Sequence, residues 1–134
     1  MNNTLQHHGI KGMKWGVRKA DKLAKSAANQ VRSEVEFDNA RRSYYTRKFD
    51  SKRDMQRAAD DLVTKNYKMN RARQTVSHMI SRLKMQYKQV NASLEKDAKT
   101  GKTYVQAVLK DKLGNQHVAR ADVGIDYIQP TKQN

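Results

Sequence analysis

The sequence has 134 residues, enough for one domain, and only 37% of them are hydrophobic, with a mean hydropathy of −1.02. We therefore do not expect a compact core of ordinary size. An elongated or oligomeric protein is expected instead. The 28 Lys and Arg residues against 13 Asp and Glu give a net charge of +15, which favours a polyanionic partner such as nucleic acid, an acidic protein surface or anionic lipid.

Several classes of protein are excluded at once. The absence of cysteine rules out disulfides and thiolate metal sites. No apolar run is long enough to span a membrane, and the N-terminus lacks the apolar segment of a secretory signal. Asn2 stands where N-myristoylation would require glycine. We therefore expect no membrane partner and a protein that stays in the compartment where it is made.

The N-terminal stretch "HHGIKGMKWGVRK", residues 7–19, holds the only tryptophan and half of the six glycines. Gly9, Gly12 and Gly16 supply backbone freedom, and basic residues lie between them. We therefore predict a flexible basic docking arm over residues 1–16, which becomes ordered on a partner. In the alternative interpretation the arm folds back over its own helices and Trp15 plugs them. The apolar residues predicted to contact the partner are Ile10, Met13, Trp15 and Val17.

Residues 17–98 form a predicted long helical region, because no glycine or proline occurs between Gly16 and Gly101. A break is expected near residues 49–52, where Ser51 begins an S-x-x-D capping box. The predicted helices are Val17–Phe49 and Lys52–Lys96, and a single unbroken helix is the alternative. The first could fold back on the second as a helical hairpin or pack on a neighbouring subunit.

The second predicted helix carries an apolar stripe with an average spacing of 3.5 residues, the repeat of a coiled coil. An ordinary amphipathic helix of a globular protein is the alternative interpretation. Asn66 at an a position would fix the register of the coiled coil. Arg73 at another a position would have to extend its charged end out of the seam or find an acidic partner. The predicted oligomer seam consists of Leu62, Asn66, Met69, Val76, Ile80, Leu83, Tyr87 and Val90.

The same segment is basic on its polar side, since no acidic residue occurs between Leu62 and Leu94. Exposed helices usually mix both signs of charge, because opposite charges one turn apart stabilise them. We interpret the run as a surface for nucleic-acid phosphates or an acidic partner, and a merely solvated face is the alternative. The predicted contact residues are Lys65, Lys68, Arg71, Arg82, Lys84 and Lys88.

A small β-hairpin is predicted over residues 102–128, with strands over 103–110 and 117–127. A loose tail is predicted over residues 129–134. A two-residue turn at Gly114-Asn115 would place Leu109 opposite Arg120. An odd-length loop of three or five residues centred on Asn115 would place Leu109 opposite Ala121 and gather one apolar face, so this register is preferred. A lone hairpin is marginally stable in water and should pack on the helices or on another subunit.

Catalytic chemistry is scarce in this sequence. His7 and His8 have no carboxylate or thiolate near them to complete a metal site, and His78 and His117 suggest structural roles. The run "TGKT" at 100–103 lacks the upstream glycine and preceding strand of a phosphate-binding loop. We therefore expect no metal, no cofactor and no enzymatic activity.

The run "HHGIKGMKWGVR", residues 7–18, resembles the short H-x-G-[IV]-x-G-M-K-W-G-x-R element of proteins encoded by tailed bacteriophages and prophages. That element occurs near a chain terminus, attached to otherwise unrelated sequences, often among head and virion structural genes. The resemblance implies a phage context and incorporation into the virion, and it implies no fold.

Together these observations predict a mainly α, non-enzymatic and oligomeric bacteriophage structural protein, associated with the virion or its head. Its expected partners are a capsid, portal or other virion protein, and packaged double-stranded DNA contacted without sequence specificity. The expected location is the virion, and the host cytoplasm before assembly. The alternatives are an intracellular nucleic-acid-binding accessory protein for packaging, replication or transcription control, and a scaffolding-type coiled coil.

Overall fold

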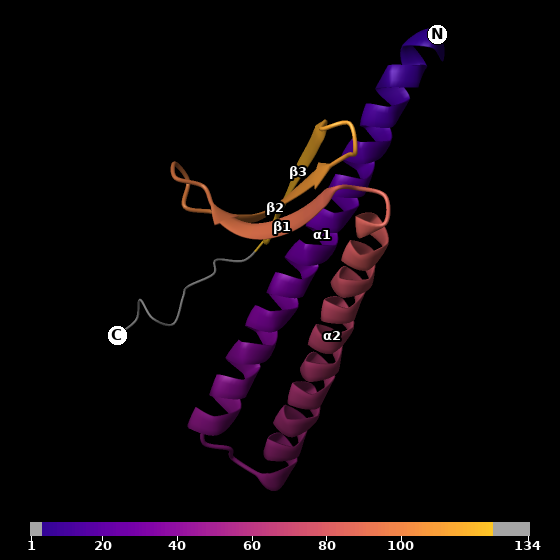
Figure 1. Ribbon diagram of the computed structural model, residues 1–134. Coiled ribbons are helices and arrows are strands. Elements are labelled where there is room, and N and C mark those ends of the chain that lie inside the picture. The colour runs from indigo at the N-terminus through magenta and orange to yellow at the C-terminus, as the bar shows by residue number, and fades with distance from the viewer. Residues whose placement is uncertain (1–3, 125–134) are drawn as a thin grey trace.

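The computed structural model describes residues 4–124, with the side chains of residues 15–124. Two long helices are followed by a three-stranded antiparallel sheet (Figure 1). The prediction of a mainly α protein with a C-terminal β-hairpin is confirmed at this level, and a third strand is added. The elements are α1 (Thr4–Thr46), α2 (Lys52–Lys84), β1 (Gln89–Lys96), β2 (Thr103–Lys110) and β3 (Gln116–Asp122).

The helices α1 and α2 form an antiparallel hairpin, so the first helix folds back within its own chain (Figure 1). The break lies in the predicted corner, although α1 ends at Thr46 and not at Phe49. Ser51 is the N-cap of α2, because its backbone is extended and its Oγ accepts the N–H of Asp54 at 3.1 Å. The capping signal in the sequence is thus confirmed.

At the other end of α1 the structure differs from the prediction. Helix α1 begins at Thr4, so Gly9, Gly12 and Gly16 lie inside the helix and no boundary separates residues 4–16 from Val17. The end of the predicted strand 117–127 and the tail 129–134 lie outside the described residues. Within the described part, no helix combines the length and apolarity needed to cross a membrane.

The prediction that the second helix runs to Lys96 is wrong, because α2 ends at Lys84 and β1 follows. Val90, Ala92 and Leu94 match the coiled-coil spacing in part, but they also alternate with polar residues, as a half-buried strand requires. All eight residues of β1 pair with β2, with Val90 opposite Leu109. Pairing with β2 decides between the two patterns, since an isolated sequence window fits both.

Both registers considered for the β2–β3 hairpin are wrong, because Leu109 lies opposite His117. The connecting loop, residues 111–115, nevertheless has the predicted odd length. Two features build it: Asp111 Oδ1 accepts the N–H groups of Leu113 and Asn115 at 3.0 and 2.9 Å, and Gly114 adopts a φ of +93°. The odd length keeps the apolar residues of both strands on one face, although the pairing shifts by four residues.

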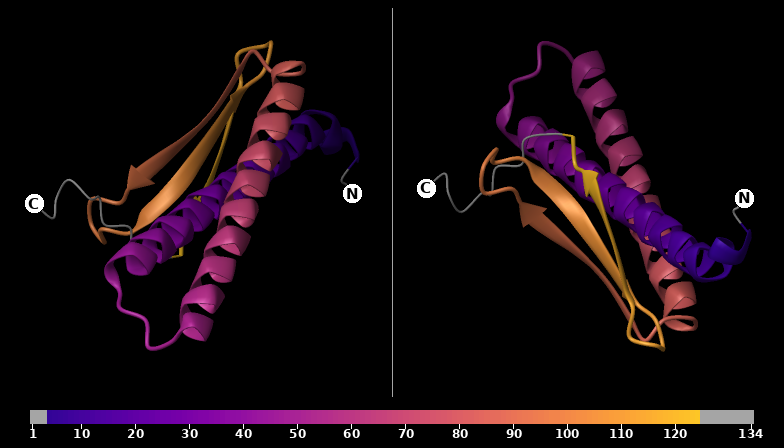
Figure 2. Two further views of the ribbon diagram at one scale, coloured as in Figure 1. Left: turned by 90° about the horizontal axis from the view of Figure 1, so that it is seen from below. Right: turned by 90° about the horizontal axis from the view of Figure 1, so that it is seen from above.

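The core lies where α1 packs against both α2 and the inner face of the sheet (Figure 2). On α1 the buried residues are mostly alanines, which let the sheet approach the helix closely, and Leu23 is the one large side chain among them. The buried residues of this core cluster are Ala20, Leu23, Ala24, Ala27 and Ala28 of α1, Val76 and Leu83 of α2, Val105, Ala107 and Leu109 of β2, and Val123.

The predicted oligomer seam is largely used inside the single chain. Met69, Val76 and Leu83 are buried, and Leu62 and Ile80 are half-buried. Asn66 is exposed in the single chain, so it is not a buried polar residue that sets the register of helix packing there. Tyr87 and Val90 lie beyond the end of α2, so the prediction that they continue a helical seam is wrong. The stripe therefore stabilises a helical hairpin with a sheet on it, and a coiled coil is not needed to bury it.

Candidate functional site

The candidate site lies on α1 around Trp15, beside β3 and the end of α2. Gly16 is buried there, directly beneath the ring of His117 from β3. A β-carbon added at Gly16 would lie 2.5 Å from Cγ of His117, well inside van der Waals contact. Gly16 is therefore required for close packing of helix on strand.

His117 is fixed in this position by its neighbours. Its side chain is 5% exposed, and its Nε2 lies 3.3 Å from Oδ2 of Asp111. The ring of Tyr87 meets it edge-on at a centroid distance of 6.2 Å. The Lys19 ammonium lies 5.7 Å from the ring centre of Tyr87, and Lys19 also donates to Gln86. These contacts join α1, β3 and the end of α2 around Gly16.

The ionisation of Asp111 contributes to this arrangement. Burial alone would raise the pKa of its carboxyl, but the hydrogen bonds from the Asn115 N–H, the His117 ring and the Leu113 N–H lower it more. The pKa of Asp111 therefore lies below its ordinary value. The pKa of the Tyr87 hydroxyl is raised, first by burial and then by the negative charge of Asp111.

Asp111→Asn is expected to reduce the stability of the protein at neutral pH and to flatten its loss in acid. A carboxyl whose pKa is lowered by folding stabilises the fold above its unfolded pKa of about 3.9 and loses this effect as the pH falls toward the folded value. The urea midpoint of the variant should therefore lie below that of the parent at neutral pH. The two midpoints should converge as the pH falls below the pKa of the Asp111 carboxyl. The control is Asp50→Asn, which removes an exposed carboxyl; equal pH profiles of parent and Asp111→Asn would contradict the prediction.

The outer side of the same segment is open to solvent. Trp15 is 55% exposed and Val17 is 46% exposed, so Trp15 does not plug the helices as the alternative interpretation required. The guanidinium of Arg18 lies 5.3 Å from the Trp15 ring centre, and Lys22 is exposed one turn further along. We call Trp15, Arg18 and Lys22 the Trp15 face. It combines a large aromatic ring with two positive charges.

The four predicted docking residues do not form one face. Trp15 and Val17 are two positions apart in a helix, so they leave it on opposite sides of the buried Gly16. The side chains of Ile10 and Met13 lie outside the described part of the chain. The spacing of the glycines carried a helical signal that the prediction missed. The intervals between Gly9, Gly12 and Gly16 are three and four residues, and the same spacing continues through the buried residues Ala20, Leu23 and Ala27.

The predicted basic track on α2 is interrupted by acids that the structure brings to it. Arg73 Nε lies 2.7 Å from Glu34 Oε2, and Lys68 Nζ lies 3.6 Å from Glu36 Oε1. Lys65 pairs with Asp61 at 2.7 Å on its own helix. All three acidic partners lie outside the acid-free stretch from Leu62 to Leu94. Two of them are on α1 and the third directly precedes the stretch, so the stretch alone did not reveal the ion pairs.

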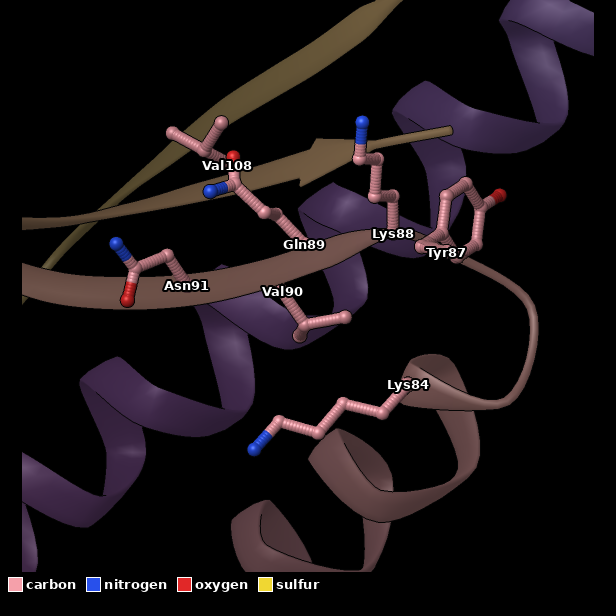
Figure 3. A pocket seen from close by; sticks show the side chains of 7 residues that line it. All are labelled: Lys84, Tyr87, Lys88, Gln89, Val90, Asn91 and Val108. Carbon is pink, nitrogen blue, oxygen red and sulfur yellow. The ribbon is translucent and has the colours of Figure 1, made fainter. Parts of the chain in front are cut away.

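The remaining predicted contact residues do not converge on one ligand position. The guanidinium of Arg71 donates to the Tyr67 hydroxyl at 3.2 Å. Among the described residues, Arg82, Lys84 and Lys88 make no ion pair. Lys84 and Lys88 line an open pocket of about 500 Å³ at the α2–β1 junction, but their side chains extend away from each other (Figure 3). This pocket is not organised to hold one anion.

Along the two helices, acidic residues are concentrated in one band, between the connection that joins the helices and the end that carries the sheet. Residues 34–38 and 58–68 carry five acidic and two basic residues between them. Towards the sheet, residues 15–33 and 69–124 together carry 16 basic and five acidic residues. The connection between the helices is basic as well, with seven basic and two acidic residues over 41–57. The molecule therefore presents two positive regions, one at each end of the hairpin.

Over the described residues, no three His, Asp or Glu side chains lie close enough together to hold a metal ion. Residues 1–22, which include the Trp15 segment, match a family of unknown function, DUF7211. Neither the curated proteins nor the solved structures give a match to the chain. Because Trp15 is exposed beside the tightly packed Gly16, we take the Trp15 face as the candidate site.

Proposed function

We propose that this protein is a non-enzymatic structural protein of a tailed bacteriophage virion or head, attached to another virion component through the Trp15 face. The observation that carries the proposal is the exposure of Trp15 beside a glycine that is locked under His117. The resemblance of residues 7–18 to the phage element supports the viral context. The attachment is expected to precede or accompany particle assembly.

The exposure of Trp15 favours a binding role on physical grounds. Tryptophan buries 150–250 Å² when covered, and it is enriched among the residues that dominate interface energies. The close packing at Gly16 holds the helix rigidly on the sheet. The segment therefore loses little conformational entropy when a partner binds. Arg18 and Lys22 beside the ring favour a partner whose contact surface is acidic.

The test compares the amount of protein in purified phage particles for the parent and for Trp15→Ala. A hot-spot tryptophan is worth at least 2 kcal/mol, so we expect about a thirtyfold weaker attachment and a matching loss from particles. Leu113→Ala is the matched control, because Leu113 is 88% exposed on the β2–β3 loop. Equal incorporation of Trp15→Ala and parent would contradict the proposal. Particles that lack the parent protein altogether would contradict it as well.

The second candidate is an intracellular nucleic-acid-binding accessory protein, favoured by the excess of positive charge on the sheet-bearing end. Such a protein would be absent from particles and would sediment with double-stranded DNA at low salt, releasing it at moderate salt. A scaffolding-type coiled coil has less support, since Met69, Val76 and Leu83 are already buried within the chain.

A further inference from the structure

The connection between α1 and α2 carries an aromatic cluster that has no part in the core. The ring of Tyr44 lies 5.2 Å from that of Tyr45, edge-on, and 5.5 Å from that of Phe49. None of the three belongs to the core cluster, which lies toward the sheet. Three of the nine aromatic residues of the chain are thus gathered at the far end of the hairpin. We call residues 41–57 the hairpin tip.

The hairpin tip displays these rings on an ordered backbone. Tyr45 is 75% exposed, and Tyr44 and Phe49 are half-buried. The last turn of α1 is closed by the Thr46 hydroxyl, which donates to the Arg42 carbonyl at 2.8 Å. The first turn of α2 is capped by Ser51. The ring of Tyr45 is therefore accessible to a ligand, on a backbone held by the last turn of α1 and the cap of α2.

Positive charge surrounds the rings. Arg41 and Arg42 pair with Asp38, at 2.9 and 3.0 Å. The Arg47 guanidinium lies over Phe49, 4.8 Å from the ring centre, so cation and ring already stack. The other basic residues of the tip form no ion pair within the described part of the chain; they are Lys48, Lys52, Arg53 and Arg57.

From this arrangement we infer that the hairpin tip binds single-stranded nucleic acid. Bases stack on the exposed Tyr45 ring, and the phosphates contact the basic side chains that flank it. Every base has a flat aromatic face, so such binding tolerates any sequence. In a duplex the faces of the bases are already stacked on one another, which leaves the ring without a partner. The tip is therefore expected to prefer single strands over duplexes.

The composition of the tip favours nucleic acid over an anionic membrane. A membrane-surface helix inserts several aliphatic side chains together with its aromatic ones. Met55 is the only apolar residue of the tip that is not aromatic, and the tip has no tryptophan. Arginine is the commonest basic residue of the tip, and arginine both stacks on bases and binds phosphate with two hydrogen bonds.

The tip and the Trp15 face are separate sites. Tyr45 follows Trp15 by thirty positions on α1, which is about 45 Å of helix at 1.5 Å per residue. The acidic band lies between the two positive regions. The inference does not rest on the proposed attachment to a virion, so either can fail without the other.

The test uses fluorescence anisotropy of the full-length protein with a labelled oligothymidylate of about 20 nucleotides and with a duplex of equal length. Tyr45→Ala removes the exposed ring at a helical position where alanine is tolerated. The loss of one stacked base should weaken binding to the single strand by about 5- to 150-fold. Tyr67→Ala is the matched control, because Tyr67 is 61% exposed on α2 and Arg71 lies 5.9 Å from its ring centre. Its effect should stay within about twofold, the spread of surface substitutions.

The charge contribution is tested separately by the triple change of Lys48, Lys52 and Arg53 to Gln. Three lost phosphate contacts should lower the slope of log affinity against log salt by about two. The control is the triple change of Lys96, Lys99 and Lys102 to Gln, which removes the same charge at the β1–β2 turn. It should leave the slope nearly unchanged.

Three results would overturn the inference. Equal affinity for the single strand and the duplex, with no effect of Tyr45→Ala, would show that the binding depends on net charge alone. Equal losses in Tyr45→Ala and Tyr67→Ala would place the contact elsewhere. Binding to vesicles of phosphatidylserine and phosphatidylcholine, without binding to the oligonucleotide, would identify the tip as a membrane contact.

Discussion

Replacing Leu23 with alanine is expected to lower the free energy of unfolding by about 2–5 kcal/mol. Leu23 is fully buried and is the largest side chain in a helical stripe made otherwise of alanines. Its neighbours on α1 are too small to fill the space that a shorter side chain would leave between the helix and the sheet. The loss should appear as a lower denaturant midpoint in urea unfolding followed by circular dichroism, with the slope unchanged.

The matched control is Val63→Ala on α2, at a position that is 68% exposed. Surface substitutions of this kind change stability by less than about 0.5 kcal/mol. If Leu23→Ala cost no more than this control, the layer between α1 and the sheet would not be the core of the protein.

Gly16→Ala is expected to destabilise the protein by about 1–3 kcal/mol, although alanine is the better helix former. Helix propensity alone would favour alanine by about 1 kcal/mol. The added β-carbon would lie 2.5 Å from the His117 ring, which is 5% exposed and held beside Asp111. Moving that ring forces strain into a packed contact, and overpacking of this kind costs about 1–3 kcal/mol. Urea unfolding of the variant measures the net effect.

A second background separates sterics from propensity. In His117→Ala the ring is gone, so Gly16→Ala should there stabilise the protein, by up to about 1 kcal/mol. The sign of the change thus reverses between the two backgrounds. A stabilising effect of Gly16→Ala in both would show that α1 and β3 do not approach closely at this point, and the rigid display of Trp15 would lose its basis.

The length of α1 separates the two proposed sites. The Trp15 face adjoins Gly16, which packs on β3, and the hairpin tip lies at the end of the helices away from the sheet (Figure 1). A protein attached by one end would hold its tip about 45 Å away, by the rise of the helix. Such a geometry suits a component that connects a protein surface to nucleic acid. The two tests are independent, because Trp15→Ala and Tyr45→Ala alter opposite ends.

Local signals in the sequence determined much of the fold. The long span without glycine or proline predicted helices, and Ser51 with Asp54 predicted the start of α2 within one residue. The alternation in residues 103–110 predicted β2 with its observed bounds. These features depend on neighbours a few residues apart, so a sequence window contains the physics that decides them. The odd length of the β2–β3 loop followed from the same reasoning, because one face of the sheet has to be apolar.

Contacts between distant segments decided what the sequence left open or predicted wrongly. Val90, Ala92 and Leu94 suit a strand or a helix, and only pairing with β2 makes them β1. The register of β3 depends on how Asp111 builds its loop, and the role of Gly16 on where His117 packs. Glu34 and Glu36 reach the basic face of α2 only because α1 folds back beside it. The sequence by itself determined the helices, one strand and the basic character of the chain. The tertiary structure decided the third strand, the pairing of charges and the exposure of Trp15, because each depends on residues far apart in the chain.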